Sequence, residues 1–414
     1  MKKSIKKKNY YNNVSFLCAC IVPLLVTGPF LPDLVVSILS LWFIYYSLNN
    51  KIYYLYKNYY FYAFISFCLV CILSSLLSDD VFFSLKASIF YIRIGIFALL
   101  ISYLIDQNKN ILNYFYYNFL VTFFLLIVDG YFQYFTGSNF FGYKAATFRL
   151  SSFFGNELIL GSYLTRLFPL FFALFLIKSK KTLFEIYSVL ILFILTYVLV
   201  FFSGERAAFL LLNISVLFMI IFCTQFKYFR LSFFIIFLSI NIFLLIKAPK
   251  LYQRYSGIGF TLSNVISETT NSERYMFSIA HDSMIKSAWK MFLDKPILGH
   301  GPKLYRIKCQ DPKYYVNVFS CSNHPHNFYI QLIAETGILG FFFLVGLLFN
   351  FIYLIAKHSF KYFIYNKTSF SNYQICLFAG LFITIWPITT NGNFFTNYLM
   401  LLYSLQVGFF KKYL

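Results

Sequence analysis

The sequence predicts an all-α membrane protein of about twelve transmembrane helices with one large, mainly helical external loop. Three observations support this fold class. The chain has 414 residues, 60% of them hydrophobic and only 12% charged, and its mean hydropathy is +0.69. Apolar runs of about 20 residues recur from end to end, and each is long enough to cross a bilayer core. Lysine and arginine gather in alternate loops between these runs.

The apolar runs divide the chain into three regions. Residues 1–248 hold nine predicted spans, residues 249–327 form a long polar loop, and residues 328–414 hold three more spans. The twelve runs are 14–31, 33–48, 59–77, 84–105, 111–135, 157–177, 183–203, 206–224, 229–248, 328–356, 373–390 and 393–410. The second and last runs are short, so ten or eleven spans are the alternative.

The distribution of charge predicts the orientation in the membrane. Five lysines precede the first run, namely Lys2, Lys3, Lys6, Lys7 and Lys8, and every second short loop is basic as well. The positive-inside rule then places both termini in the cytoplasm, which agrees with an even number of spans. These loops account for much of the net charge of +21, so we expect no nucleic-acid partner. We interpret the first run as an uncleaved span, and a cleaved signal peptide is the alternative.

The loop 249–327 is predicted to lie outside and holds about ten lysines and arginines. Long loops are translocated regardless of their charge, so this loop does not contradict the orientation. Its charge has two interpretations, a solvated domain or a surface for an anionic substrate or anionic lipid headgroups. We expect residues 259–273 to be flexible or extended. The pattern of 272–294 predicts a helix with apolar residues along one side.

Only two of the eight cysteines, Cys309 and Cys321, lie in this loop, and the other six lie in predicted spans. An oxidising exterior permits a disulfide between these two cysteines, which would tie down the segment just before His324. Metal binding by Cys321 and His324 is the rival interpretation. The order of thiols and histidines matches no usual zinc spacing, so we expect the disulfide and no metal.

The segment His324-Pro325-His326-Asn327 comes directly before an apolar run. The unperturbed pKa of histidine lies close to physiological pH, so it is the natural proton acceptor at such a membrane edge. Proline fits a first helical turn, and Asn323 or His324 is a candidate N-cap. The positive potential at a helix N-terminus favours neutral imidazole, the form that a general base needs. A plain helix-capping motif is the structural alternative.

Asn327, Gln331 and Glu335 recur every four residues along the helix that follows. This spacing makes one polar stripe on an otherwise apolar helix. Because lipid would reject such a stripe, we expect it to face the interior of the protein.

Several arginines fall at predicted external positions. Arg206 stands at the start of a helix, where a cation is disfavoured unless an anion is near. Glu205 is one candidate anion, and a phosphate held in a bidentate fork is the other. Arg274 lies in the external loop, and Arg149 and Arg166 lie near a further external segment. Together these residues predict an anionic, phosphate-bearing substrate.

The motif after the external loop resembles the signature of a known family. It consists of His326, Asn327, nine residues, Gly337, two residues and Gly340. In this respect the chain resembles the O-antigen ligase and O-antigen polymerase superfamily of bacterial polytopic glycosyltransferases, and the ligases most closely. Three further segments resemble segments of that family: FFGNELILGSYL at 153–164, SGERAAF at 203–209 and AWKMFLDKPILGHGP at 288–302.

This resemblance implies a multi-pass enzyme of the bacterial inner membrane with its active site facing the periplasm. The donor would be a glycan on undecaprenyl pyrophosphate, and the acceptor a sugar hydroxyl of the lipid A core. His326 would be the catalytic base, and Arg206 and Arg274 would bind the pyrophosphate. Supporting roles are expected for His324, Asn327, Glu335 and Arg149.

The same resemblance implies inversion at the anomeric carbon and no cofactor or metal, because the pyrophosphate leaving group carries the activation. Membrane lipids would surround the helices, and the apolar spans would hold the polyprenyl tail. Two alternatives differ in the acceptor: an O-antigen polymerase and a protein O-oligosaccharyltransferase. A lipid-linked-sugar transporter or a membrane receptor is the alternative from a different class of protein.

Overall fold

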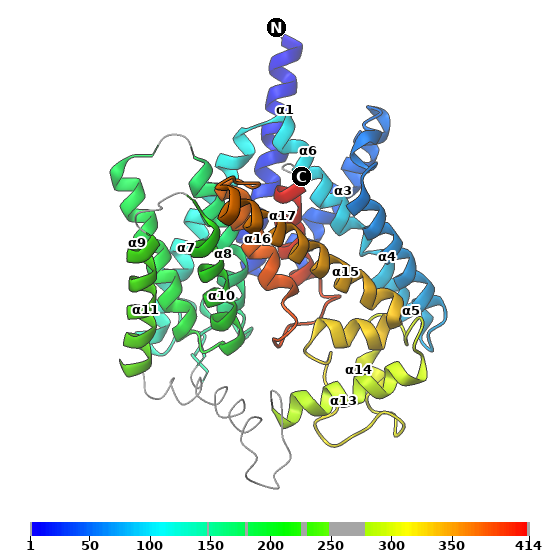
Figure 1. Cartoon of the computed structure of the whole chain (residues 1–414). Coiled ribbons are helices and arrows are strands. Elements are labelled where there is room, and N and C mark those ends of the chain that lie inside the picture. The colour runs from blue at the N-terminus through cyan, green and yellow to red at the C-terminus, as the bar shows by residue number, and fades with distance from the viewer. Residues whose placement is uncertain (1, 147–148, 179–180, 225–229, 248–277, 412–414) are drawn as a thin grey trace.

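A computed structural model describes residues 2–411 of the chain, apart from 147–148, 179–180, 225–229 and 248–277 (Figure 1). The described residues form helices joined by turns and loops and contain no strand, which confirms the predicted all-α class. Arg274 and residues 259–273 belong to the part that is not described, so the expectations for them stay predictions.

Most of the helices are long and apolar. Before residue 248 they are α1 (Lys2–Ala19), α2 (Ile21–Leu24), α3 (Phe30–Asn49), α4 (Tyr59–Leu76), α5 (Val81–Ile89), α6 (Ile92–Gln107), α7 (Asn110–Thr136), α8 (Leu160–Ile177), α9 (Leu183–Phe202), α10 (Arg206–Phe222) and α11 (Arg230–Lys247). After residue 277 they are α13 (Ile279–Asp294), α14 (Tyr305–Lys308), α15 (Phe328–Tyr365), α16 (Asn372–Ile385) and α17 (Asn397–Lys411).

Among the described residues, eight helical segments are long and apolar enough to cross a membrane. They are Asn9–Thr27, Phe30–Asn49, Tyr59–Leu76, Val81–Gln107, Asn110–Thr136, Leu160–Ile177, Leu183–Phe202 and Phe328–Tyr365. Two shorter apolar helices are α10 and α16. Each of the twelve predicted runs overlaps a helix, but the structure does not confirm twelve spans.

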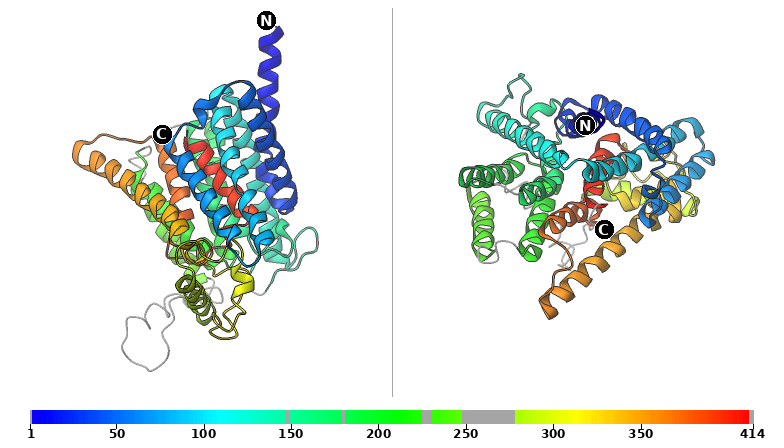
Figure 2. Two further views of the ribbon diagram at one scale, coloured as in Figure 1. Left: turned by 90° about the vertical axis from the view of Figure 1, so that its right-hand side faces the viewer. Right: turned by 90° about the horizontal axis from the view of Figure 1, so that it is seen from above.

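The last two helices lie in the middle of the bundle. Helix α16 packs against α8 and α10, while α17 packs against α6. Aromatic rings fill the neighbouring space, with Phe171 5.1 Å from both Phe123 and Phe193 between ring centroids. Helix α15 crosses one side of the bundle, where it packs on α4 and α13 (Figures 1 and 2).

Helices α13 and α14 lie at the opposite end of the molecule from the start of α1 (Figures 1 and 2). Ser278 caps α13 by accepting a hydrogen bond from the backbone N–H of His281. Met284, Ala288 and Met291 are buried on the side of α13 that faces α15. The helix predicted here is therefore confirmed from residue 279 to 294, within the described part of the chain.

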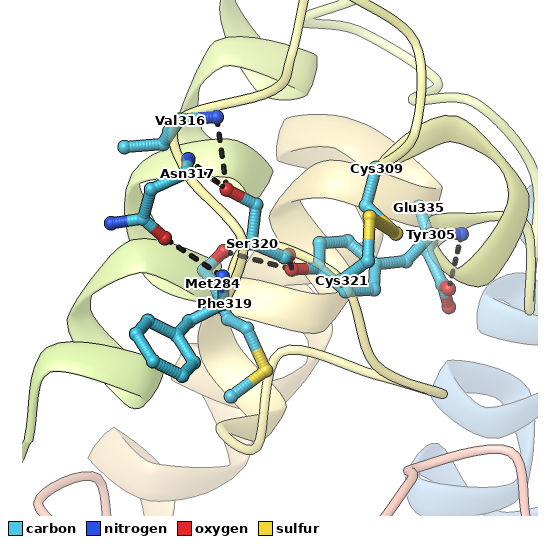
Figure 3. Close-up of a disulfide and its surroundings, with 9 residues drawn as sticks. All are labelled: Met284, Tyr305, Cys309, Val316, Asn317, Phe319, Ser320, Cys321 and Glu335. Atoms are coloured by element: carbon cyan, nitrogen blue, oxygen red, sulfur yellow. Dashed lines mark hydrogen bonds between the residues drawn. A yellow bond between two sulfur atoms is a disulfide. The ribbon is translucent and has the colours of Figure 1, made fainter.

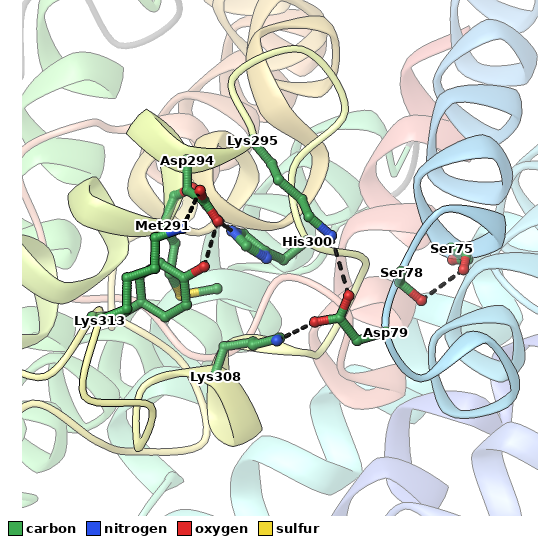
Figure 4. Close-up of polar contacts among 10 residues, drawn as sticks. Ser75, Ser78, Asp79, Met291, Asp294, Lys295, His300, Lys308 and Lys313 are labelled. Carbon is green, nitrogen blue, oxygen red and sulfur yellow. Dashed lines mark hydrogen bonds and ion pairs between the residues drawn. The ribbon is translucent and has the colours of Figure 1, made fainter.

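Ion pairs attach this end of the chain to the turn between α4 and α5 (Figure 4). Asp79 binds Lys308 and, at 3.2 Å, Lys295. The imidazole of His300 donates from Nε2 to the carbonyl oxygen of Met291, 3.0 Å away, which holds the segment after α13 against that helix. These contacts fix the position of the loop that carries the candidate site.

Candidate active site

A polar cleft of about 880 Å³ opens beside the start of α15. Its lining comes from six parts of the chain: the turn before α3, the loop and first turns of α8, the loop and first turns of α10, Arg306 of α14, the segment before α15, and the segment between α16 and α17. Four of the residues singled out from the sequence as site candidates line it, namely Arg149, Arg206, His324 and His326. Asn327 and Glu335 are not among its lining residues.

Helix α15 begins later than the sequence predicts. Its N-cap is Asn327, whose side-chain oxygen accepts the backbone N–H groups of Tyr329 and Ile330 at 3.0 and 3.2 Å. The proposal that Asn323 or His324 caps the helix is therefore wrong. Pro325 also lies before the helix, because the helix begins only at Phe328, where the side chain of Asn327 satisfies two of the first-turn donors.

The two motif histidines are held by the backbone of Asn391. The N–H of Asn391 donates to the carbonyl oxygen of His326 at 2.7 Å. Nε2 of His324 donates to the carbonyl oxygen of Asn391 at 3.1 Å, so the proton of neutral His324 sits on Nε2. His326 itself adopts a left-handed backbone with φ of 57°, a conformation that L residues rarely adopt.

The histidines form a row of three close rings. The ring centroid of His326 lies 4.1 Å from that of His324 and 5.2 Å from that of His281, which is on α13. Burial lowers the pKa of His326 to about 4, with a further lowering from His281 and an opposing effect of the Asn391 hydrogen bond. Burial and the neighbouring His326 lower the pKa of His324 to about 3. Both imidazoles are neutral at pH 7 and able to accept a proton.

Arg206 is the first residue of α10, as the sequence predicts, and it follows Glu205, the N-cap residue of that helix. The Glu205 carboxylate accepts the backbone N–H groups of Gly161 and Ser162 at 2.7 and 3.1 Å, in the first turn of α8. Burial raises the pKa of Glu205 to about 7, against the opposing charge of Arg149. A Cβ at Gly161 would lie 2.4 Å from the side chain of Ser203, so the segments before α8 and α10 pack closely.

Arg166 joins α8 to the segment between α16 and α17. It is buried, and its guanidinium donates to Ser162 Oγ at 3.0 Å and to Asn391 Oδ1 at 3.1 Å. Arg149 donates to the carbonyl oxygen of Leu158 at 2.7 Å. Together with Arg206 these arginines bring three cationic side chains to the part of the lining that also holds Glu157 and Glu205.

The polar stripe of α15 faces the interior, as predicted. Asn327, Gln331 and Glu335 are all buried. Gln331 donates to Glu335 Oε2 and to Asn393 Oδ1, each at 2.9 Å, and Glu335 Oε1 accepts the N–H of Tyr305 at 3.1 Å. In the described structure, these hydrogen bonds connect α15 to α14 and to Asn393, which lines the cleft.

A disulfide joins Cys309 and Cys321, with their Cα atoms 5.2 Å apart (Figure 3). The hydroxyl of Tyr305 contacts the carbonyl oxygens of Met284 and Ser320 beside it. The bridge and this tyrosine connect α13 and α14 to the chain that leads into His324. The segment before the motif is thus attached at several points to the rest of the loop.

Three residues around the histidines were not predicted from the sequence: Asn391, His281 and Arg306. Asn391 lies in the two-residue gap between the predicted spans 373–390 and 393–410, whereas the structure has a longer non-helical segment, 386–396, between α16 and α17. The signal for it is Pro387 followed by the polar run 389–393 in an otherwise apolar stretch. His281 lies on the half-buried side of a helix where no pattern distinguishes it, so only its three-dimensional position associates it with the site.

The fold and the cleft define a multi-pass membrane protein with histidines and arginines gathered at one end. Residues 190–345 match the family described as O-antigen ligase. This match includes Arg206 and the whole motif from His326 to Gly340, and it supports the resemblance of the chain to the O-antigen ligase and polymerase superfamily. Among curated proteins, no significant match is found.

This match also bears on the general activity. It indicates a membrane enzyme of the glycosyltransferase type that acts on a lipid-linked glycan and an acceptor. The matched segment contains one wall of the cleft and the two motif histidines, but it ends before Asn391 and begins after Arg149 and Arg166.

Proposed function

We propose that this protein is an O-antigen ligase of the bacterial inner membrane. It would transfer a glycan from undecaprenyl pyrophosphate to a sugar hydroxyl of the lipid A core on the periplasmic face, without a metal or other cofactor. The observation that carries the proposal is that neutral His326 and cationic Arg206 line the same cleft. A base and an anion-binding group are the two functions that this reaction needs.

The residues of the cleft suit an in-line displacement. The acceptor oxygen would attack the anomeric carbon while its proton passes to His326, and the bond from that carbon to the pyrophosphate oxygen would break. Arg206 would stabilise the negative charge that develops on the departing pyrophosphate, together with Arg149 and Arg274. Attack from the face opposite to the leaving group inverts the anomeric centre.

His324 would act as a supporting residue. Its hydrogen bond to Asn391 fixes its ring next to His326, and two neighbouring imidazoles disfavour protonation of each other. Asn327 and Glu335 would act from a distance, by fixing the start of α15 and its contact with α14. We therefore assign catalysis to His326, and positioning to these three residues.

The test is complementation of a ligase-deficient bacterium with a matched lipid A core, with lipopolysaccharide resolved on a gel. We expect an O-antigen ladder from the wild type and no ladder from His326→Ala at equal membrane expression. His358→Gln is the matched control, because this histidine lies on the same helix α15 but outside the cleft. It should preserve the ladder.

Each other result has a defined meaning. A ladder from His326→Ala would refute the assignment of the base. Absence of a ladder from well-expressed wild type, combined with longer lipid-linked glycans or glycosylated periplasmic proteins, would instead indicate a polymerase or a protein O-oligosaccharyltransferase. Movement of lipid-linked sugar across the membrane without transfer would indicate a transporter.

A further inference from the structure

Arg306 and Lys303 are two basic residues of the external loop, of which Arg306 lines the cleft and Lys303 lies three residues before it, outside the lining. Arg306 is on α14 and lines the cleft. Its Nη2 donates a long hydrogen bond of 3.5 Å to the carbonyl oxygen of Asn323, and its Nε has no partner among the described residues. Within the described part of the chain, neither side chain forms an ion pair.

Three other lysines of this loop form ion pairs with aspartates. Lys295 and Lys308 share Asp79, and Lys313 binds Asp294 (Figure 4). Arg306 and Lys303 are therefore a local excess of positive charge and not part of a general ion-pair network.

The position of Lys303 makes this excess unfavourable in the protein alone. Lys303 is half-buried and has a left-handed backbone with φ of 67°. Burial lowers the pKa of Lys303 and the charge of Arg306 lowers it further, while the carboxylates of Glu335 and Asp33 act in the opposite direction. Glu335 is buried, does not line the cleft and is hydrogen-bonded to Gln331 and to the backbone of Tyr305. Among the described residues it therefore leaves the guanidinium of Arg306 without an ion pair and able to bind an anion supplied by a ligand.

Arg306 of α14, Arg166 of α8 and Arg206 of α10 line the same cleft from different elements. Figures 1 and 2 show α10 and α14 on opposite sides of the middle of the molecule. Arg306 is also bonded to Asn323, the residue immediately before His324. In an in-line displacement the attacking and departing oxygens lie on opposite faces of the reacting carbon, and the base lies beside the attacking oxygen.

We propose that Arg306 forms a second anion subsite of the cleft, to which Lys303 adds positive charge from outside the lining, and that this subsite binds a phosphate group carried by the acceptor glycolipid. This inference rests on the proposed ligase function, in which Arg206 holds the donor pyrophosphate. The guanidinium of Arg306 suits a phosphate because it presents two parallel donors, and the contact of its carbon Cζ with the ring of Phe83, 6.0 Å to the centroid, limits its orientations. The subsite would place the acceptor sugar next to His326.

The experiment measures transfer by the full-length protein in lipid nanodiscs, with the donor and two forms of acceptor. One acceptor is the phosphorylated lipid A core, and the other is the same glycolipid after enzymatic removal of the core phosphates. For the wild type we expect a lower KM for the phosphorylated acceptor. Arg306→Gln should raise that KM roughly tenfold and remove the preference, with the donor KM and kcat little changed.

Three further variants make the result specific. Lys303→Gln should raise the acceptor KM by a smaller factor, and Arg306→Lys should restore part of the preference. Lys286→Gln is the matched control, since Lys286 is an exposed lysine of the same loop that does not line the cleft. It should behave as the wild type does.

Two results would overturn the proposal: a persistent preference for the phosphorylated acceptor in Arg306→Gln, and a rise in the donor KM in place of the acceptor KM. Failure of the wild type to transfer to any acceptor would refute the proposed function instead. In that case, direct binding of the two glycolipids still tests the subsite. Equal preference of wild type and Arg306→Gln for the phosphorylated form would refute it.

Discussion

His326 combines a rare backbone conformation with a buried side chain. A left-handed φ of 57° costs a non-glycine residue about 1 kcal/mol, and such a residue persists only where its surroundings hold it in place. Here the hydrogen bond from Asn391 and the helix that starts at Phe328 restrain the residue on both sides. The restraint directs the imidazole into the cleft between His281 and His324.

The lowered pKa of His326 predicts an unusual pH profile. A general base works only when it is neutral, and burial lowers its pKa to about 4. We therefore expect kcat/KM to show no loss of this base between pH 7 and pH 5, and to fall about tenfold per unit below pH 4. Steady-state transfer by purified protein would measure this, with circular dichroism as the control for folding.

A decline in kcat/KM centred near pH 6.5 would contradict this prediction. It would mean that the imidazole of His326 is as hydrated as in a model peptide. Glu205 provides an internal comparison, because burial raises its pKa to about 7. A change near pH 7 that disappears in Glu205→Gln would belong to that carboxyl and not to the base.

Helix α15 consists of two helical parts that meet at Gly337. This residue has φ of 64° and ψ of −165°, far from helical values. The loop segment 296–301 lies against the break, and its backbone bonds the groups that the interrupted helix leaves unpaired: Gly301 N–H donates to Glu335 O, and Ile338 N–H donates to Pro296 O, each at 2.8 Å. The glycine of the family signature thus serves packing between the loop and α15.

Substitution of Gly337 tests this account. A Cβ at this position would lie 2.3 Å from the backbone carbonyl group of Ile297, and backbone cannot move aside as a flexible side chain does. We expect Gly337→Ala to destabilise the protein by about 2 kcal/mol or more and to lower the thermal midpoint in detergent. Intrinsic fluorescence on heating measures the midpoint.

Gly346→Ala is the matched control in the same helix. An added Cβ there meets no heavy atom within 4 Å. Alanine is the better helix former by about 1 kcal/mol, so this variant should be as stable as the wild type or slightly more stable. Equal loss of stability in both variants would contradict the role assigned to the break at Gly337.

At the scale of the elements, the helices and the buried polar stripe of α15 could be predicted from the sequence. Hydropathy located a helix in each of the twelve runs, and the four-residue spacing of Asn327, Gln331 and Glu335 predicted a buried stripe. Hydropathy could not separate a helix from an apolar chain that is interrupted by a few polar residues. Hydropathy therefore did not predict that α16 ends at Ile385 and that α17 begins only at Asn397, with a segment of the candidate site between them.

For the whole molecule, the orientation in the membrane can be tested with single cysteines. The positive-inside rule predicts that α13 is periplasmic and that the loop between α3 and α4 is cytoplasmic. Lys290 and Lys51 are exposed in these two places. In intact cells whose outer membrane is permeable to the reagent, a membrane-impermeant maleimide should label Lys290→Cys and spare Lys51→Cys.

The unmodified chain is the blank for this measurement, because its free cysteines are buried apart from the half-buried Cys20. Lysis should make Lys51→Cys reactive, which shows that its thiol is present. Labelling of Lys51→Cys alone in intact cells would reverse the predicted orientation. The reaction would then have to take place on the cytoplasmic face.

The hydrogen bond between Asn391 and His326 joins two parts of the chain that differ in their relation to the family. The histidine lies inside the segment 190–345 that the family shares, and the asparagine lies outside it. The recognisable segment is therefore not a separable module. A chimaera that exchanged only this segment between relatives would inherit the base without Asn391, whose backbone holds it in place.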